Sequence, residues 1–550
     1  MRSVDVEYNH KKVFTMVADL VLTNGKIITV DPKGTIAEAV AIKFGKILAV
    51  GSEKDIKPLI NKKTKVLDLK GKTILPGFID SHCHPLYEGL AKVMAIDCSY
   101  ESGVRSIRDI QNRIREKAKT TPKGEWINVV NVDDSKLIEK RHLTRWELDE
   151  AAPAHPVCVN KIGYQFSIFN SKAFEMAGIT KDTPDPPGGW FERDPVTGEL
   201  TGVAYGRAVE MVQSIPFGRE PTLEKRKEGI KLILKEYATA GITCAYDGWA
   251  TPSDIRALIE LYNNNELPIR IRLDVWYELL PILEKCGIIQ GLGNDWLRLC
   301  GVKVVFDGAI SICTAALTKP YLHKPNYYGE FAITREELRK IIMEYYAKGY
   351  RFSVHANGDK AIKMYLEIIE EAQKKYPKKK LRNRCIHCTV VSPAIIKNLK
   401  KLDILPTILG TYPYYYGDML LPAFGTDRLQ WMFAARSMLD AGLIVSAHSD
   451  HPAAPYSPLL AIHSLVNRKT MKGLLVGEKQ RVSIMEAIRL YTINAAYQQF
   501  DEDKLGSIEP GKFADLVVLS ENPLTVPPEK IKDIQVEMTI VDGKIVYTRE

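Results

Sequence analysis

The chain lacks any apolar run of about 18 residues, the length that a membrane-spanning helix needs. Its first residues, MRSVDVEYNHKKVFTM, contain neither the apolar segment nor the cleavage site of a secretory signal. The nine cysteines are scattered and odd in number, which does not fit a disulfide framework. We therefore expect a soluble, cytoplasmic protein that does not act at a membrane.

Several nucleotide-binding and catalytic signatures are also missing. The sequence has no GKS or GKT phosphate loop, no GxSxG elbow and no dinucleotide-binding glycine fingerprint. Ser–His hydrolysis therefore has no support. The net charge of +9 comes from lysines spread along the chain rather than from one block, so nucleic acid is not an expected partner.

The composition is that of an ordinary globular protein. With 550 residues, 45% of them hydrophobic and 26% charged, the chain is too long for one core and indicates two or three domains. Abundant Lys, Glu, Ile and Tyr with little Gln is typical of thermophilic proteins. The sequence leaves the assembly state open, a homodimer included.

Two closely spaced histidines are the most informative feature that is present. His82 and His84 lie in the run LPGFIDSHCHP, residues 75–85. Side chains two apart on a strand point to the same face, so both imidazoles are expected to leave one strand end together, with Cys83 turned away into the core. Imidazole suits zinc, iron, nickel and copper. The pair is half of a metal site.

The residues around this pair carry a family resemblance. Pro76-Gly77 before the apolar run and Asp80-Ser81 after it resemble the strand-1 signature of the amidohydrolase superfamily of metal-dependent hydrolases. This resemblance implies a metal-dependent enzyme that acts on a small-molecule substrate.

Apolar runs that alternate with helical periodicity predict an α/β fold with a (β/α)8 TIM barrel. Eight candidate strands lie at residues 73–80, 242–246, 269–274, 300–306, 352–355, 384–387, 404–409 and 443–447. The barrel would occupy residues 73–94 and 226–507. The count requires that residues 95–225 form an inserted, loop-rich lobe on the substrate side, as the run DTPDPPGGWFERDPVTGE indicates.

The two ends of the chain contain similar turns. Asn24-Gly25, Phe44-Gly45 and Asp542-Gly543 each precede Lys-Ile between alternating apolar runs, a pattern typical of hairpins. Short hairpins need partners that cover their apolar faces. We therefore expect residues 1–72 and 508–550 to form one composite β-sandwich.

By resemblance, four further residues at strand ends join the histidine pair. The family pattern implies metal ligation by His82, His84, Lys303, His355, His387 and Asp450. It also implies that Lys303 is N-carboxylated and bridges two divalent ions, which we expect to be zinc, although one ion per chain is the alternative. Asp450 would be the catalytic acid and base.

The finer resemblance is to the amidohydrolase-3 branch, which includes N-substituted formamide deformylase-like proteins. It is carried by DGAISICTAAL, HANGDKAI, LYTINAAY and NSKAF. The chain departs from the branch at Ile162-Gly163-Tyr164 and near Gly206, which leaves its specificity open. Candidate substrate-binding residues are Tyr164, Thr314, Tyr321, His323 and Tyr414. The run Tyr412-Pro413-Tyr414-Tyr415-Tyr416, together with Trp126 and Trp190, is a candidate substrate roof.

We predict a hydrolase that cleaves a non-peptide C–N bond of an amide, formamide or cyclic amide. A mononuclear-zinc aminohydrolase, or deaminase, with unmodified Lys303 is the alternative enzyme, and a catalytically silent scaffold is the alternative of another class. The other histidines, including His448 and His451, are expected to serve ordinary packing. Cys385 and Cys388 are expected to face opposite ways rather than to form half of a zinc site.

Overall fold

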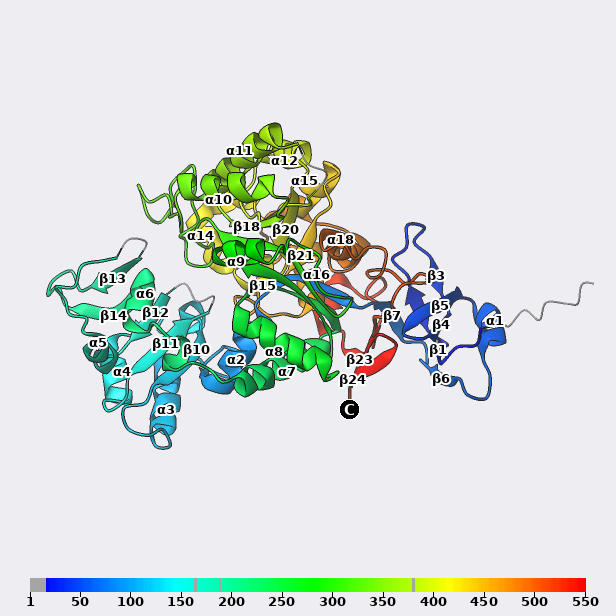
Figure 1. Cartoon of the computed structure of the whole chain (residues 1–550), viewed down its shortest axis with the longest axis horizontal. Helices are drawn as coiled ribbons and strands as arrows, with labels where there is room; N and C mark the ends of the chain where they lie inside the picture. The colour runs from blue at the N-terminus through cyan, green and yellow to red at the C-terminus, as the bar shows by residue number, and fades with distance from the viewer. Residues whose placement is uncertain (1–15, 163–165, 187–188, 378–380) are drawn as a thin grey trace, which may run out of the picture.

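The structure is a computed structural model that describes residues 16–162, 166–186, 189–377 and 381–550. Figure 1 shows a central barrel, with the inserted lobe on one side and small sheets built from both chain ends on the other.

Eight parallel strands form the central sheet, in the order β21-β20-β19-β18-β17-β16-β15-β8. The first and last strands also meet, because the Ser81 hydroxyl of β8 donates to the Ala447 carbonyl of β21 at 2.8 Å. The predicted α/β fold with an eight-stranded, barrel-like parallel sheet is confirmed. The strands are β8 (Phe78–Cys83), β15 (Ile242–Ala250), β16 (Arg270–Trp276), β17 (Leu297–Val305), β18 (Phe352–Ala356), β19 (Arg384–His387), β20 (Leu405–Leu409) and β21 (Ser446–His448).

The run predicted as the first barrel strand is split in two. β7 (Thr73–Pro76) joins the sheet of the chain ends, and only β8 belongs to the barrel. Gly77 separates them, and its N–H donates to the Asp515 carbonyl at 2.8 Å. A Cβ at Gly77 would lie 2.2 Å from the Thr243 hydroxyl, so the crossing has no room for a side chain.

Amphipathic helices cover the outside of the barrel (Figure 1). In α11, the residues that are buried, such as Ile362, Leu366 and Ile369, recur every three or four positions, as a helix packed on a sheet requires. The helices of the barrel region are α2 (Pro85–Met94), α7 (Leu223–Thr239), α8 (Pro252–Asn263), α9 (Leu280–Lys285), α10 (Arg335–Ala347), α11 (Asp359–Lys375), α12 (Pro393–Lys401), α13 (Tyr412–Tyr415), α14 (Gly417–Leu429), α15 (Ala435–Asp440), α16 (Pro458–Asn467), α17 (Ile484–Leu490) and α18 (Ile493–Gln498).

Strands from the two chain ends lie in two small sheets, ordered β5-β4-β1-β6 and β24-β23-β22-β7-β2-β3. The sheets share one apolar core, in which Leu22 and Ile42 pack with Leu516 and Ile540. The elements are β1 (Leu20–Thr23), β2 (Lys26–Ile28), β3 (Ile36–Ala37), β4 (Ala39–Lys43), β5 (Lys46–Gly51), α1 (Glu53–Ile56), β6 (Lys65–Asp68), β22 (Leu516–Leu519), β23 (Val536–Val541) and β24 (Lys544–Thr548).

Two of the three predicted hairpins are confirmed. β4 pairs with β5 and β23 pairs with β24, both antiparallel, around Phe44-Gly45 and Asp542-Gly543. The prediction for Asn24-Gly25 is wrong, because β1 and β2 belong to different sheets. A tight turn there carries the chain from one sheet to the other.

The insertion after β8 has a sheet of its own, in the order β13-β14-β12-β11-β10-β9. It is therefore less loop-rich than its Pro- and Gly-containing stretch indicated. Its elements are β9 (Ile96–Asp97), α3 (Ile107–Ala118), β10 (Ile127–Val132), α4 (Arg145–Ala151), β11 (Val157–Lys161), β12 (Phe166–Phe169), α5 (Ser171–Ala177), β13 (Gly189–Arg193), β14 (Leu200–Gly206) and α6 (Arg207–Val212).

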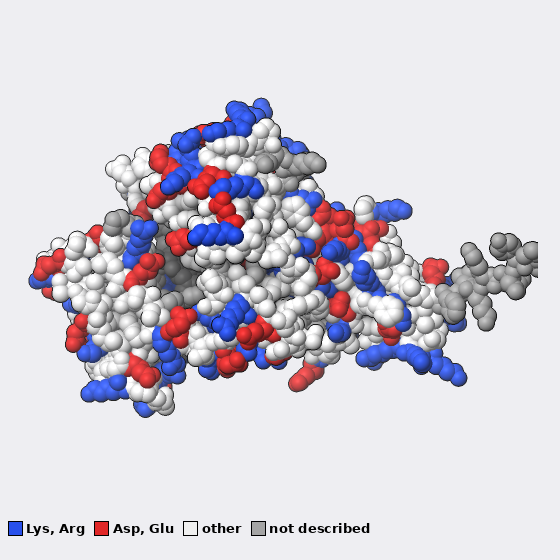
Figure 2. Space-filling model, viewed as in Figure 1, with Lys and Arg blue, Asp and Glu red and all other residues white. Residues whose placement is uncertain are grey.

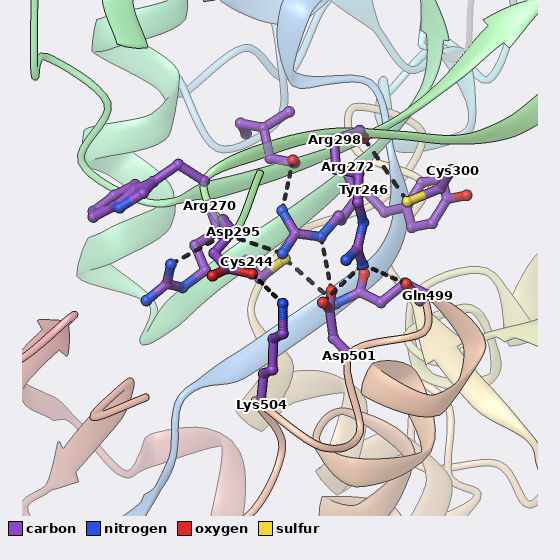
Figure 3. A network of polar contacts seen from close by, with 12 residues as sticks. Cys244, Tyr246, Arg270, Arg272, Asp295, Arg298, Cys300, Gln499, Asp501 and Lys504 are labelled. Atoms are coloured by element: carbon purple, nitrogen blue, oxygen red, sulfur yellow. Dashed lines mark hydrogen bonds and ion pairs between the residues drawn. The ribbon is translucent and has the colours of Figure 1, made fainter. Parts of the chain in front are cut away.

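A network of buried ion pairs lies near the N-terminal ends of the barrel strands (Figure 3). Asp501 accepts from Arg272 at 2.7 Å and lies 2.7 Å from Arg298, and its side chain is fully buried. Arg270 pairs with Asp515 at 2.7 Å, which links this end of the barrel to β22. Each of these buried charges therefore faces a charge of the opposite sign.

The molecular surface carries both signs of charge. On the face shown in Figure 2, basic and acidic side chains are interspersed. Within the part of the chain that the structure covers, no helix is long and apolar enough to cross a membrane.

Candidate metal centre

The six side chains expected to bind metal come together at one end of the barrel. The carboxyl ends of parallel strands meet at the same face, which is where TIM barrels carry their functional groups. The six are His82 on β8, His84 at the start of α2, Lys303 on β17, His355 on β18, His387 on β19 and Asp450 just after β21.

His82, His84, Lys303 and Asp450 form one half of the cluster. The Lys303 Nζ lies 2.9 Å from His82 Nε2. The same His82 nitrogen lies 3.4 Å from Asp450 Oδ1, and His84 Nε2 lies 3.5 Å from that oxygen. One carboxylate oxygen therefore faces two imidazoles from the end of β8.

His355 and His387 form the other half. His387 Nε2 lies 3.0 Å from His355 Nδ1, and His355 Nε2 lies 3.1 Å from the Gly308 carbonyl. The two halves are contiguous, because ligand atoms of His82, His387 and Asp450 all lie within 4.8 Å of one another.

The donor set fits a divalent ion. Burial lowers the pKa of His355 to about 4 and lowers the pKa values of His82 and His387 well below their ordinary range, so these imidazoles are neutral and offer lone pairs. His82 Nδ1 and His387 Nδ1 are buried and have no hydrogen-bond partner among the described residues. Histidine nitrogens and carboxylate oxygens are both zinc ligands in proteins.

Asp450 and Lys303 are both buried ionisable groups. Burial would raise the pKa of Asp450, but the hydrogen bond from His84 and the charges of nearby cations lower it, so Asp450 is ionised. Burial lowers the pKa of Lys303 to about 8, although Asp450 and Asp274 oppose that shift. Above this pH the Lys303 amine is uncharged.

Two aspartates that lie within the family motifs, but to which the sequence analysis gave no role in the site, hold the ligand strands in place. Asp80 accepts from the Ser449 N–H and hydroxyl at 3.1 and 2.5 Å, which ties β8 to the residue before Asp450. Burial raises its pKa to about 7. The sequence feature that could have identified Asp80 as part of the site is its position two residues before His82, which puts both side chains on the same face of the strand.

The second of these aspartates is Asp307, which follows β17. Its carboxylate accepts backbone N–H groups of Ala316, Asn357 and Gly358 at 2.8 to 2.9 Å. Burial raises its pKa to about 7. Asp307 thereby fixes the loop after β17 against the end of β18, next to His355, which lies 3.7 Å away.

Two further aromatic residues lie near the cluster. His448, assigned to ordinary packing, has its ring 5.2 Å from that of His82 and 5.1 Å from that of His387. Burial raises the pKa of Tyr412 well above its ordinary value, and the negative charge of Asp450 contributes. His448 lies in no recognisable motif, so only the fold reveals its position, whereas Tyr412 belongs to the tyrosine-rich run after the seventh barrel strand that was predicted to form part of a substrate roof.

The predicted substrate residues lie in different surroundings. Thr314 lines a cavity, whereas Tyr321 is a core residue that donates to the Ala315 carbonyl at 3.0 Å. His323 is exposed. Tyr414 packs edge-on against His463 of α16, with ring centroids 5.3 Å apart. Tyr164 lies outside the described residues.

The cavity that contains Thr314 has a volume of about 180 Å³ and lies between the inserted lobe and the loop after β17. Trp190 stacks on Tyr205 in its wall, with centroids 4.3 Å apart. Trp126, the other predicted roof residue, packs against Phe169 inside the lobe. The further lining residues are Asp134, His142, Lys161, Phe166, Ile312, Lys324 and Tyr327.

The prediction that Cys385 and Cys388 face opposite ways is wrong. Both are buried in the same apolar core, and their side chains contact each other. The physical reason is the backbone, because His387 and Cys388 both have positive φ, 70° and 44°, which breaks the strand alternation. Cys83 is a buried core residue, as expected.

Comparisons with known proteins show the family of the chain. The sequence model of a family described as "Amidohydrolase family" matches residues 65–547. A putative amidohydrolase, YtcJ of Bacillus subtilis, is 28% identical over 96% of this chain and 98% of its own length. An N-substituted formamide deformylase of Arthrobacter pascens is 27% identical over 97% of this chain and 99% of its own.

A solved structure has the same architecture. The crystal structure of a metal-dependent hydrolase from Pyrococcus horikoshii superposes with a TM-score of 0.75 and 25% identity. The alignment covers 92% of this chain and 99% of that one.

Proposed function

Because the chain belongs to the amidohydrolase family, we propose that it uses a divalent metal to hydrolyse a non-peptide C–N bond of an amide, formamide or cyclic amide. The observation that carries the proposal is the group of His82, His387 and Asp450 at the mouth of the barrel. The N-substituted formamide deformylase among the relatives supports the bond type.

The halves of the cluster suggest two ion positions. His82, His84 and Asp450 would hold one ion, and His355 and His387 would hold the other. A divalent ion, most simply zinc, supplies Lewis acidity toward a carbonyl and lowers the pKa of a water molecule.

Asp450 would move the proton during hydrolysis. Its lowered pKa leaves it ionised, so it can accept a proton from the attacking water. As the C–N bond breaks, Asp450 would return that proton to the leaving nitrogen. His84, 3.5 Å away, keeps this carboxylate oriented.

Lys303 would link the two halves as a carbamate. Its uncharged amine can attack CO2, which forms an N–C bond and releases one proton. The product is an anion, whereas a protonated lysine beside two cations would be strongly repelled. The Lys303 Nζ lies 2.9 Å from His82 Nε2, which supports a carbamate oxygen at the ion position beside His82.

The cavity beside the centre would receive the substituent on the nitrogen. The loop that carries Thr314 begins at Gly308, whose carbonyl lies 3.1 Å from His355 Nε2. The stacked rings of Trp190 and Tyr205 suit a flat apolar or aromatic group. Thr314, at the same wall, offers a hydroxyl for orientation.

The test is a substrate panel assayed with zinc-loaded protein. N-formyl and N-acyl amines, cyclic imides and nucleobases are incubated with wild type, Asp450→Asn and the exposed control Asp427→Asn, and the released amine or acid is measured. We expect turnover of a carboxamide by wild type and Asp427→Asn only. Ammonia released from nucleobases alone would instead support the deaminase, and no turnover of any compound would support the scaffold.

A further inference from the structure

His448 occupies the centre of the histidine cluster without any assigned role. It is the last residue of β21, two positions before Asp450, and its side chain is fully buried. Its ring lies 5.2 Å from the ring of His82 and 5.1 Å from the ring of His387. It therefore touches both halves of the proposed centre at once.

Neither ring nitrogen of His448 has a hydrogen-bond partner in the described part of the chain. A neutral imidazole has one N–H donor and one lone pair, and leaving such a group unsatisfied in the interior costs about 1–3 kcal/mol. An orphaned histidine in the middle of a barrel therefore calls for a partner that the polypeptide does not provide.

Buried histidines elsewhere in the molecule are satisfied. His463 of α16 lies 3.2 Å from the Pro528 carbonyl through Nδ1, and His155 lies 3.1 Å from the Glu125 carbonyl. The Tyr237 hydroxyl lies 3.0 Å from Nδ1 of His451. The unpaired state of His448 is thus a property of its place beside His82 and His387.

The ring spacing fits a shared ion. Two imidazoles that bind one zinc ion through bonds of about 2.1 Å at a tetrahedral angle have centroids about 5 Å apart. The separations of His448 from His82 and His387 agree with that value, as does the 4.9 Å between His82 and His84.

From this geometry we infer that His448 is a further metal ligand, which adds a neutral donor on the β21 side of the centre to the six residues named above. The inference rests on the proposed function, because it needs an ion at this site. Since His448 brings no charge, it strengthens binding without changing the charge balance between the ions, Asp450 and Lys303.

The test measures metal binding rather than catalysis. Full-length wild type, His448→Ala and His448→Gln are compared with His463→Gln, which replaces a buried histidine whose Nδ1 lies against the Pro528 carbonyl. Zinc affinity is measured by competition with a chelator, zinc content by elemental analysis after dialysis, and coordination by the visible absorption of the cobalt-loaded protein. Thermal melting of the metal-free proteins reports whether each variant folds.

We expect both His448 variants to bind zinc at least about 10- to 100-fold more weakly than wild type, as losing a direct ligand should cost no less than losing an outer partner. Their cobalt spectra should change, whereas His463→Gln should match wild type in both measurements. Unchanged zinc affinity and an unchanged cobalt spectrum in the His448 variants would overturn the inference.

A failure of the inference can be told from a failure of the proposed centre. If His82→Ala loses its zinc while His448→Ala keeps wild-type affinity, only the role of His448 is wrong. If wild type binds no zinc, or His82→Ala keeps all of it, the centre itself is wrong. Should the His448 variants not fold, anomalous diffraction from zinc-loaded wild-type crystals decides the question, because a ligand nitrogen must lie about 2.0–2.1 Å from an ion.

Discussion

The two ends of the barrel differ in whether their buried polar groups have partners within the protein. At the N-terminal end, Arg272 and Arg298 share Asp501, so that each charge has a partner (Figure 3). At the C-terminal end, His82 Nδ1 and His387 Nδ1 are buried without a partner among the described residues. Paired charges fix a structure, whereas unpaired lone pairs cost stability and leave donors for an ion. The first end is built for stability and the second for chemistry.

The largest expected effect is on the metal centre at the C-terminal end of the barrel. His82→Ala should remove most of the bound metal and lower turnover more than about a thousandfold, because it deletes a direct ligand. The free energy of unfolding of the metal-free protein should fall by about 2 kcal/mol, because removal of the fully buried imidazole leaves a cavity. Elemental analysis and urea unfolding check the two parts. Full metal retention would contradict the site.

The next largest effect is on the buried ion pairs at the N-terminal end of the barrel. Asp501→Asn should lower the free energy of unfolding by about 3–5 kcal/mol, because Arg272 and Arg298 would remain buried without a carboxylate. Folded molecules should keep the wild-type metal content and turnover. Asp427→Asn, at an exposed helix position, is the control for loss of a carboxylate. Loss of metal with unchanged stability would reverse the assignment of the two ends.

A pH-dependent effect tests the state of Lys303 at the C-terminal end of the barrel. The pKa of Lys303 is lowered to about 8, so the amine is protonated below that pH and uncharged above it. Only the uncharged amine adds CO2, so the carbamate should increase as the pH rises through about 8 and decrease as it falls. Carbon-13 NMR with labelled bicarbonate, and intact mass at each pH, measure it.

The variant Lys303→Ala is the companion to that measurement. We expect it to lose about one metal equivalent and most activity, and to give no carbamate signal. Full metal content and full turnover in Lys303→Ala, with no carbamate in wild type, would replace the two-ion mechanism with the one-ion aminohydrolase.

The smallest expected effect separates two neighbouring tyrosines. Tyr412→Phe should lower kcat/KM severalfold, about 1 kcal/mol, because its hydroxyl lies close enough to feel the charge of Asp450. Tyr414→Phe should leave kcat/KM unchanged, since its ring packs on His463 outside the centre. Steady-state kinetics on one substrate are sufficient. Equal losses in both variants would show that Tyr414 also faces the substrate.

The sequence predicted the features that depend on residues close together in the chain. Eight barrel strands follow from short apolar runs with helices between them, and His82 and His84 follow from their spacing. The six-stranded sheet of the insertion could not be predicted in the same way, because β12 pairs with β14 across the intervening α5 and β13. Pairing between distant segments leaves no local signal.

The site shows the same limit. His448 is the last residue of a strand with no motif around it, and Asp307 opens the motif DGAISICTAAL without an indication of its partners. Only the closure of the barrel brings the two residues to the ligands. The direction of the Cys388 side chain depends on the positive φ angles of His387 and Cys388. Positive φ is uncommon for residues other than glycine, so the sequence does not predict it.

The passage from β7 through Gly77 into β8 determines when, during synthesis of the chain, the strand before His82 can find its neighbours. Leu75 of β7 lies opposite Val517 of β22, a residue that a ribosome adds only after the whole barrel has been made. β2, the other neighbour of β7, precedes it in the chain, whereas β22 follows the barrel. One edge of the strand that leads to His82 therefore has no partner until the barrel strands have been made, and such distant pairings form slowly. A nascent chain thus carries both histidines of the first motif long before that edge is covered.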